Sequence, residues 1–460
     1  MKLSAQRLLV IGTVWPEPKS SAAGLHLLSL IDTLHRAGAE CHFASPASPY
    51  SDEHSAQHTI DLAALSITAH TIELNASSFD DFVSALAPDI VLFDRFMIEE
   101  QFSWRVRKAC PNALCVLDTE DIHSLRHIRQ QLTNQDPSLS LDIRALQCYH
   151  LGQQLPDGSS PPPHLLGCLH NDLALREIAS IMRMDLSLII SRVELEYLTA
   201  NYPIAEQRLH YCPFLISPLS DEQITQWPAY EQRQDFVFIG NYRHAPNWDA
   251  VQILAKHIWP LIKTALPHAK CHVYGAYTPA KAQQFHQPKH GFYIQGWAQD
   301  AQQVLQEARV NLAPVRFGAG LKGKLFDAMQ VGTPSVTSPI GAEGIENMNP
   351  QTIGALSEEF AQVAIALFSS QTQWQVAQND IQPLLAGDFD RQTHQYALVN
   401  RISDALMNRE RDRATDFWQH LLNRQSLKAT QYMSQWIEAK QTIAQLQQSN
   451  HQPEIDSDDD

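Results

Sequence analysis

The segment from Val310 to Glu346 constrains the fold of this chain more than any other. It has the pattern of a strand, a glycine-rich loop that contains Lys322 and Lys324, a short helix and a second strand. A loop of this kind before a helix can hold a phosphate group, because backbone N–H groups and the positive end of the helix converge on the anion. Asp327 follows one helical turn later, within reach of a sugar hydroxyl on the same ligand. We therefore expect a site for a nucleotide or another phosphorylated ligand; the alternative is a loop that only makes a tight turn.

Strand-like and helix-like segments alternate along almost the whole chain, a pattern typical of parallel sheets covered by helices. In the first half a buried strand begins at Arg7, an amphipathic helix is predicted over Gly24–Ala37, and Ser191–Glu194 has the spacing of a capping box. The alternation restarts with a strand at 236–241 and a helix over Trp248–Leu266. We therefore predict an α/β chain with two Rossmann-like, doubly wound domains that face a cleft, with ligands at the carboxyl ends of the strands.

Changes in composition along the chain suggest where its domains begin and end. Residues 217–234 are polar and punctuated by proline, as expected of a linker. We predict an N-terminal domain over residues 1–216 and a C-terminal domain over residues 235–386. Residues 387–449 are long, polar helical sequence that we expect to pack across both domains, and residues 450–460 form an acidic tail that we expect to be disordered.

Charge and cysteine content argue against several classes of function. The net charge of −16 disfavours nucleic acid as a partner, because phosphate backbones are bound by positively charged surfaces. No apolar run has the length of a membrane span, and the N-terminus lacks the apolar core of a signal peptide, so a cytoplasmic protein is predicted. The seven cysteines are scattered without C-x-x-C spacing, which favours neither a disulfide framework nor a structural zinc site.

The glycine-rich loop also matches the pattern of a dinucleotide-binding site. Gly318, Gly320 and Gly323 have G-x-G-x-x-G spacing, and Glu343 follows 20 residues after the last of them. An NAD-dependent oxidoreductase is therefore an alternative. Two features weigh against it: the predicted helix is only about two turns long, and two lysines within the loop suit a more highly charged terminal diphosphate.

The stretch Pro314–Glu343 resembles the donor-site signature of retaining glycosyltransferases with the GT-B fold, in particular the glycogen-synthase-like group known as family four. The resemblance rests on Lys322, an Asp-Ala-Met sequence from Asp327, a Gly-Thr-Pro-Ser-Val sequence from Gly332 and a Gly-Ala-Glu-Gly turn from Gly341. It extends over most of both predicted domains and is most specific in the C-terminal one.

The resemblance implies transfer of a sugar from a nucleotide-diphosphate donor to a glycan, a lipid-linked or another acceptor, with retention at the anomeric carbon. The C-terminal half would hold the donor and the N-terminal half the acceptor, and the nucleotide-sugar would be a co-substrate, with no cofactor. Fixed cations at Arg316, Lys322 and Lys324 would stabilise the leaving diphosphate in place of a metal ion. The only plain D-x-D pair, Asp456 and Asp458, lies in the acidic tail, so no metal site is predicted.

Further donor-site residues follow from the same resemblance. Asp327 would accept hydrogen bonds from the ribose, Trp297 would contact the base, and the turn with Gly341 and Glu343 would lie near the diphosphate or the sugar. Helix-terminal charge for Asp327 and core packing for Trp297 are the structural alternatives. The complete predicted donor set is Gly240, Arg243, Trp297, Arg316, Gly320, Lys322, Lys324, Asp327, Gly341 and Glu343.

In the N-terminal half, the segment Leu117–Arg126 concentrates charged residues after a predicted strand. It resembles the place where relatives carry a His-Asp pair near the reacting carbon. Asp121 matches the aspartate of that pair, and Glu120 stands where the histidine would be. His123 could take over the role of that histidine, so Asp121 and His123 are the candidate catalytic residues. The alternative is a capped helix with a solvated charged face.

Departures from the family pattern leave other functions open. Ala319 stands where relatives carry an acid that contacts the donor sugar, and Asn241 and Asn247 stand where an Arg-and-Lys pair is usual. A non-catalytic GT-B scaffold in a glycan-assembly complex is therefore an alternative, as is an epimerase that converts its donor without an acceptor. The long C-terminal helices leave a peripheral membrane contact open, and the sequence does not determine the oligomeric state.

Overall fold

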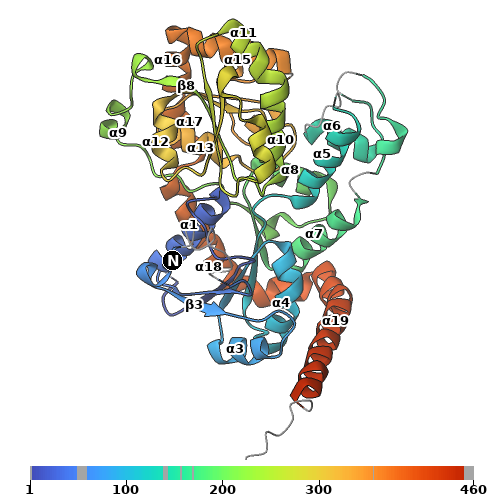
Figure 1. Cartoon of the computed structure of the whole chain (residues 1–460). Helices are drawn as coiled ribbons and strands as arrows, with labels where there is room; N and C mark the ends of the chain where they lie inside the picture. The colour runs from blue at the N-terminus through green and yellow to red at the C-terminus, as the bar shows by residue number, and fades with distance from the viewer. Residues whose placement is uncertain are drawn as a thin grey trace, which may run out of the picture.

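The chain forms two parallel β-sheets flanked by helices (Figure 1). The α/β fold class with two Rossmann-like sheets, predicted from the sequence, is confirmed. The acidic tail over residues 450–460 lies outside the described residues, so the expectation that it is disordered stays a prediction. The structure, a computed structural model, describes residues 3–48, 60–137, 143–155, 158–167, 170–355 and 357–449.

The N-terminal sheet has seven strands in the order β3-β2-β1-β4-β5-β6-β7, and all neighbours run parallel. Every residue of β4 and β5 is buried, as expected of central strands that are covered on both faces. The strands are β1 (Arg7–Ile11), β2 (Glu40–Ser45), β3 (Ile67–Thr71), β4 (Ile90–Asp94), β5 (Leu114–Asp118), β6 (Leu186–Ile189) and β7 (Leu209–Tyr211).

The C-terminal sheet has five parallel strands in the order β10-β9-β8-β11-β12. In each sheet the strand order reverses beside the first strand: β1 lies between β2 and β4, and β8 lies between β9 and β11. Such reversals create a crevice at the carboxyl ends of the strands, where ligands bind in open α/β sheets. The strands are β8 (Gln234–Ile239), β9 (Cys271–Tyr274), β10 (Phe292–Gly296), β11 (Ala308–Ala313) and β12 (Ser335–Thr337).

Helices connect the strands and cover both sheets. The helix predicted over Trp248–Leu266 is a continuous helical run of α10, a π-helical turn (Leu254–Ile258) and α11. The helices are α1 (Ala22–Arg36), α3 (Ser78–Leu86), α4 (Phe96–Ala109), α5 (His123–Gln135), α6 (Ile143–Leu151), α7 (Asp172–Arg183), α8 (Arg192–Asn201), α9 (Asp221–Thr225), α10 (Ala245–Ile253), α11 (Trp259–Ala265), α12 (Ala301–Glu307), α13 (Gly323–Gln330), α14 (Pro339–Ala342), α15 (Ser357–Ser369), α16 (Gln371–Asn379), α17 (Ile381–Asp388), α18 (Arg391–Thr415) and α19 (Phe417–Ser449).

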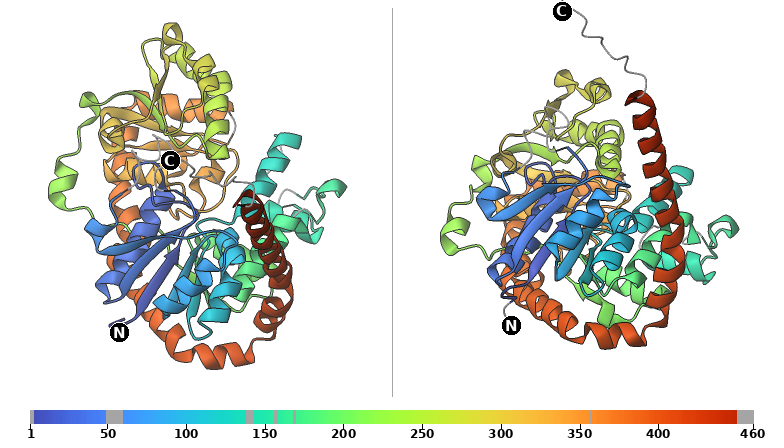
Figure 2. Two further views of the ribbon diagram at one scale, coloured as in Figure 1. Left: turned by 60° about the horizontal axis from the view of Figure 1, so that its bottom comes forward. Right: turned by 90° about the horizontal axis from the view of Figure 1, so that it is seen from below.

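The predicted C-terminal helical extension is present and joins the two halves of the molecule. Phe389, which follows α17, packs on Phe326 of α13 with ring centroids 4.6 Å apart. α18 then buries Leu398 and Ile402 in the core of the N-terminal sheet, and α19 runs back along the other side of that domain (Figure 2). Among the described residues, no helix combines the length and the apolar character needed to cross a membrane.

Two details differ from the sequence-based expectation. The edge strands β3 and β7 were not predicted, and the capping box over Ser191–Glu194 was wrong. Ser191 is the N-cap of α8, but its side chain makes no capping hydrogen bond. Glu194 instead accepts hydrogen bonds from the N–H groups of Ile122 and Gly320, each at 2.8 Å. These two donors lie in a buried junction between the domains, where unsatisfied N–H groups would be costly.

Candidate active site

A cleft of about 850 Å³ lies between the two sheets, at the carboxyl ends of their strands. One wall contains residues that directly follow β1, β4 and β5, and the other contains residues that follow β8 and β11. The cleft therefore lies at the reversal of strand order in both sheets, which is where the sequence predicted a ligand site. After each of these five strands at least one residue lines the cleft, for example Thr13, Arg95, Glu120, Asn241 and Val315.

The loop between β1 and α1 forms part of the cleft and contacts the opposite domain. The hydroxyl of Tyr277 donates to Glu17 Oε1 at 2.8 Å, and Asn241 Nδ2 donates to the carbonyl of Ser20 at 3.5 Å. The loop packs closely on α1 at Gly24, where an added Cβ atom would lie 2.8 Å from the backbone of Glu17. These contacts connect the two domains through the wall of the cleft.

Two helix N-termini meet inside the cleft. α1 begins beside Ser21, whose side chain accepts from the N–H of Gly24 at 3.1 Å. α13 begins at Gly323, where an added Cβ would lie only 2.2 Å from the Cβ of Ala22. Only glycine permits this approach, and both helix ends line the cleft. Because each N-terminus carries a partial positive charge, this part of the cleft favours an anion.

Lys322 and Lys324 lie at the same helix end, and burial weakens the charge of both. Lys322 Nζ donates to the carbonyl of Gly320 at 2.8 Å, and burial lowers its pKa to about 8. Lys324 Nζ donates to Asn247 Oδ1 and lies 4.4 Å from the ring centre of Phe238. Burial lowers the pKa of Lys324 to about 7. An incoming anion would favour the protonated form of each lysine.

Asp327 lies in the cleft beside these lysines, as the sequence predicted. Burial raises the pKa of its carboxyl to about 7, and the nearby Lys324 only partly opposes this shift. A hydrogen bond from a hydroxyl group would stabilise this carboxyl, because burial shields its oxygen lone pairs from water. The side chain can therefore receive a sugar hydroxyl from a ligand bound at the helix end.

The acidic cluster after β5 forms the opposite side of the cleft. Asp121 pairs with Arg126 and with His123, whose Nε2 lies 3.3 Å from Asp121 Oδ1. Burial alone would raise the pKa of Asp121, but Arg126 and the neighbouring histidines hold it well below its usual range. Burial lowers the pKa of His123 to about 4. At neutral pH the two candidate catalytic residues are therefore a carboxylate beside a neutral imidazole.

Arg95 and Glu120 also line this wall, although neither was among the predicted site residues. Burial, reinforced by Asp118, raises the pKa of Glu120 well above its usual range, and the carboxylate of Asp94 raises the pKa of Arg95. The sequence held a signal for Arg95, because it directly follows the buried strand β4. His244, the N-cap of α10, is a further unpredicted lining residue.

A buried junction beside the cleft holds the glycine-rich loop against the N-terminal domain. Arg129 donates to the carbonyl of Gly318 at 2.6 Å and to Glu343 Oε1 at 2.7 Å. The N–H of Gly320 donates to Glu194. Neither Arg129 nor Glu194 was predicted as a site residue, because both contact partners that are distant in sequence. The junction occupies groups that the sequence analysis had assigned to the donor.

The predicted site residues divide into two groups. Arg316 pairs with Asp249 at 2.5 Å, and Gly341 packs so tightly on Thr337 that a Cβ would lie 2.0 Å from its hydroxyl oxygen. Four predicted residues do not line the cleft, so their roles in binding the nucleotide-sugar stay predictions: Arg316, Gly320, Gly341 and Glu343. The residues that do line it are Asp121, His123, Gly240, Arg243, Trp297, Lys322, Lys324 and Asp327.

Within the described part of the chain, no three His, Cys, Asp or Glu side chains are grouped so that they could hold a metal ion. The lysines and arginines that line the cleft are Lys19, Lys322, Lys324, Arg95, Arg126 and Arg243.

Comparison with known families identifies the C-terminal domain. Residues 233–370 match the model of the family described as Glycosyl transferases group 1. The match confirms the resemblance seen in Pro314–Glu343: this part of the chain is similar to group 1 glycosyltransferases. No curated protein matches the sequence.

Solved structures of glycosyltransferases show that the chain has the GT-B fold over 87% of its length. Sucrose-phosphate synthase from Thermosynechococcus elongatus is 13% identical, with 87% of this chain and 98% of that chain covered and a TM-score of 0.59. HepE from Anabaena, in complex with UDP and glucose, is 14% identical over 87% and 100% of the two chains, with a TM-score of 0.56. The lipopolysaccharide outer core galactosyltransferase WaaB is 14% identical over 87% and 99%, with a TM-score of 0.52. Because the sequence identities are only 13–14%, this likeness establishes the fold alone.

Proposed function

We propose that this protein transfers a sugar from a nucleoside diphosphate donor to a glycan, a lipid-linked or another acceptor, with retention and without a metal ion. The observation that carries the proposal is the meeting of two helix N-termini with Lys322 and Lys324 in one cleft. The group 1 domain and the structural likeness to HepE, which was solved with UDP and glucose, support it.

The chemistry of sugar transfer explains why the cleft would need these groups. Departure of the nucleoside diphosphate places negative charge on its terminal phosphate, and stabilisation of that charge lowers the barrier. The two helix ends, together with Lys322 and Lys324 in their protonated forms, supply positive charge at one place. Asp327, on the same helix, is positioned to accept a ribose hydroxyl. Trp297, which also lines the cleft, is the proposed contact for the base.

Asp121 and His123 are the proposed catalytic residues in the opposite wall. The charged Asp121 is suited to stabilise positive charge that develops on the donor sugar, and the neutral imidazole of His123 can hydrogen-bond a sugar or acceptor hydroxyl. The acceptor would enter from the N-terminal domain. Closure of the two domains would exclude water that hydrolyses the donor.

A thermal-shift panel with UDP, GDP, ADP, their sugar conjugates and NAD tests the donor site. Ligand at about 100 times its dissociation constant stabilises a protein by roughly 2.7 kcal/mol, which raises the melting temperature visibly. We expect one nucleoside diphosphate to stabilise the wild type and to lose this effect in Lys324→Gln. Lys289→Gln is the matched control, because Lys289 is exposed in the same domain and does not line the cleft. Stabilisation by NAD alone would favour the oxidoreductase instead.

The non-catalytic scaffold remains the second candidate, because one specific observation favours it. Glu343, which the resemblance places near the donor, is paired with the fully buried Arg129. Release of nucleoside diphosphate from the stabilising sugar nucleotide, with and without glycan acceptors, separates the two functions. Turnover that disappears in Asp121→Asn supports the enzyme. Binding of the sugar nucleotide without any turnover on a broad acceptor panel would favour the scaffold.

A further inference from the structure

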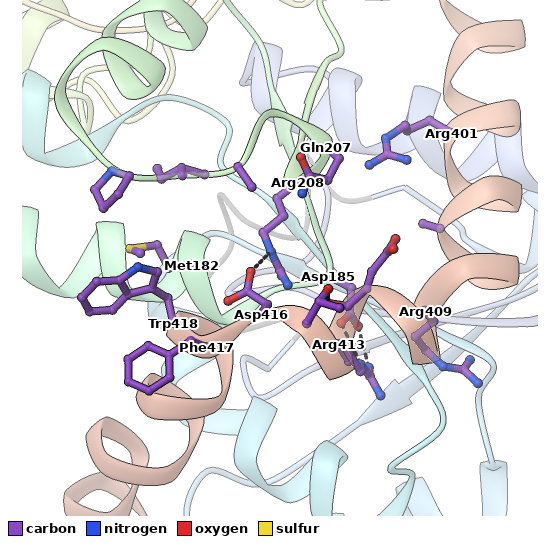
Figure 3. Close-up of a pocket in the computed structure, with 16 residues that line it drawn as sticks. Met182, Asp185, Gln207, Arg208, Arg401, Arg409, Arg413, Asp416, Phe417 and Trp418 are labelled. Carbon is purple, nitrogen blue, oxygen red and sulfur yellow. Dashed lines mark hydrogen bonds and ion pairs between the residues drawn. The ribbon is translucent and has the colours of Figure 1, made fainter.

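The long C-terminal helix α19 is fixed to the N-terminal domain at its start by polar contacts. Arg208 Nε lies 2.6 Å from Asp416 Oδ2, and Arg413 pairs with Asp185 at 2.6 Å (Figure 3). Just inside the helix, the buried Gln419 donates to a backbone carbonyl at 3.0 Å. The direction in which α19 leaves α18 is therefore set by several buried or partly buried bonds.

The face of α19 that lies on the domain remains polar further along. Ser434 Oγ accepts from Arg105 Nη2 at 3.1 Å, and Glu438 Oε1 accepts from the N–H of Ser77 at 2.8 Å. Residues four apart lie on the same side of a helix, so Ser434 and Glu438 mark the side that faces the domain. From Gln441 to residue 447 every side chain is exposed, and the end of the helix extends past the neighbouring helices (Figure 2).

The opposite face of α19 carries exposed aromatic and aliphatic side chains. Tyr432 is 62% exposed, Trp436 is 55% exposed and Ile443 is 54% exposed. Trp436 lies two residues, or about 200° of helical rotation, beyond Ser434, so it points away from the domain. A helix that anchors through polar groups and exposes its aromatic and aliphatic residues is the reverse of an ordinary surface helix. This pattern indicates that the outer face contacts something else.

The spacing of these residues indicates what the partner is. Alternating steps of three and four residues connect the exposed positions, which is the a/d pattern of a coiled coil. The register runs from Ala429 to Leu446, which is about 26 Å of helix. Its members from the middle of the helix onward are Ala429, Tyr432, Trp436, Ala439, Ile443 and Leu446, which we call the α19 seam.

We propose that the α19 seam pairs in parallel with the α19 seam of a second copy of this chain, forming a two-stranded coiled coil. The β-branched Ile443 falls at an a position and Leu446 at a d position, the combination that favours two parallel strands. Met433, which is 57% exposed, flanks the stripe at an e position.

The charges that flank the seam are compatible with this pairing. In a parallel coiled coil, a g residue meets the e residue five positions later on the partner. Lys428 would then face Met433, and Gln435 would face Lys440, so no like charges meet. The ammonium of Lys440 lies 4.4 Å from the ring centre of Trp436 in the same chain.

A dimer of this kind leaves the candidate active site open. The N-terminal domains lie on the outer sides of the paired helices, because each domain contacts the face opposite the seam. No residue of α19 lines the cleft between the two sheets. The two-fold axis runs along the coiled coil, and the interface is therefore the same patch on both copies.

Light scattering coupled to size-exclusion chromatography tests the proposal on the full-length chain over a concentration series. The wild type should have twice the mass of one chain, and Trp436→Glu should have the mass of a single chain. Gln441→Glu is the matched control, since it makes a similar change at an exposed position on the opposite face of the same helix and should remain dimeric. Unchanged circular dichroism in both variants would confirm that they are folded.

A cysteine cross-link tests the orientation of the helices. Ala439→Cys should form a disulfide-linked dimer under mild oxidation, because d residues face each other in a parallel pair. Gln441→Cys and the wild type, with its native cysteines, should not. A monomeric wild type would overturn the proposal, as would a dimer that survives Trp436→Glu. Monomers that bind anionic lipid vesicles through Trp436 would assign the seam to a membrane surface instead.

Discussion

Glu194 is predicted to make the protein less stable as the pH rises. Its carboxyl lies in the buried junction between the domains, where Oε1 accepts the N–H groups of Ile122 and Gly320. Its other oxygen, Oε2, has no hydrogen-bond partner among the described residues. Burial, and then the negative charge of Asp121, raises the pKa of this carboxyl from 4.5 to about 8.

The sign and size of the effect follow from proton linkage. In the unfolded chain the carboxyl ionises near pH 4.5, whereas in the folded protein it stays protonated up to about pH 8. Between these values the folded state holds the extra proton, so the free energy of unfolding decreases as the pH rises, by at most about 1.4 kcal/mol per pH unit. The decrease reaches about 3 kcal/mol by pH 7 and about 5 kcal/mol over the whole window.

Glu194→Gln should remove this pH dependence of the free energy of unfolding, with little change in the shape of the side chain. Glutamine keeps the oxygen that accepts both N–H groups and replaces only the oxygen that lacks a partner. We expect the variant to match the wild type near pH 4.5 and to exceed its stability by about 3 kcal/mol at pH 7. Because the variant cannot ionise, the difference between the two proteins should grow steadily with pH.

Urea unfolding followed by tryptophan fluorescence, at several pH values within the window, measures this difference. Glu196→Gln is the matched control, because Glu196 is exposed on the same helix and should give a curve parallel to that of the wild type. If the free energy of unfolding of Glu194→Gln also changes with pH as that of the wild type does, the carboxyl is ionised in the folded protein. The argument from burial would then be refuted.

The affinity for a nucleoside diphosphate should fall as the pH rises above about 7, because burial lowers the pKa of Lys324 to that value and a diphosphate favours the protonated form. Calorimetry in two buffers of different ionisation enthalpy should show proton uptake on binding, and equal heats would contradict this. Arg129→Met should destabilise the protein by about 3–5 kcal/mol, because it removes the buried ion-pair partner of Glu343. Adding Glu343→Gln should restore part of that loss in urea unfolding; a further loss would show that the pair is not the cause. Asp121→Asn should lower kcat about 100-fold or more while the nucleotide Kd stays nearly unchanged; an unchanged kcat would remove Asp121 from the proposed catalytic pair.

The central strands were predictable because both of their faces are buried. Every residue of β4 and β5 is buried, and all but the last residue of each strand are apolar, so the sequence shows continuous hydrophobic runs. The edge strands lack this signal: β3 has only one buried residue, and β7 is three residues long. Their pairing depends on the neighbouring strand more than on their own composition, and a periodicity argument therefore misses them.

The parts of the site that local sequence determines were also predictable. Lys322, Lys324 and Asp327 belong to one loop and one helix, so their common location follows from the order of residues. The junction was not predictable, because Arg129 meets Glu343 from 214 positions away and Glu194 meets Gly320 from 126 positions away. Only the packing of two domains brings these groups together. The short spacing from Ser191 to Glu194 suggested a local cap, but the side chain of Glu194 accepts from the distant N–H groups of Ile122 and Gly320 instead.

The junction changes the way in which the cleft must recognise a donor. The N–H of Gly320 donates to Glu194, and Glu343 is paired with Arg129. The glycine-rich loop therefore offers a phosphate fewer groups than its sequence suggests. The positive charge beside this loop then depends on the two helix ends and on lysines whose pKa values burial has lowered. A strongly anionic diphosphate can draw protons onto these lysines, whereas a weakly charged ligand cannot. Selectivity for a nucleoside diphosphate would therefore come from the linkage between binding and protonation as well as from the shape of the loop.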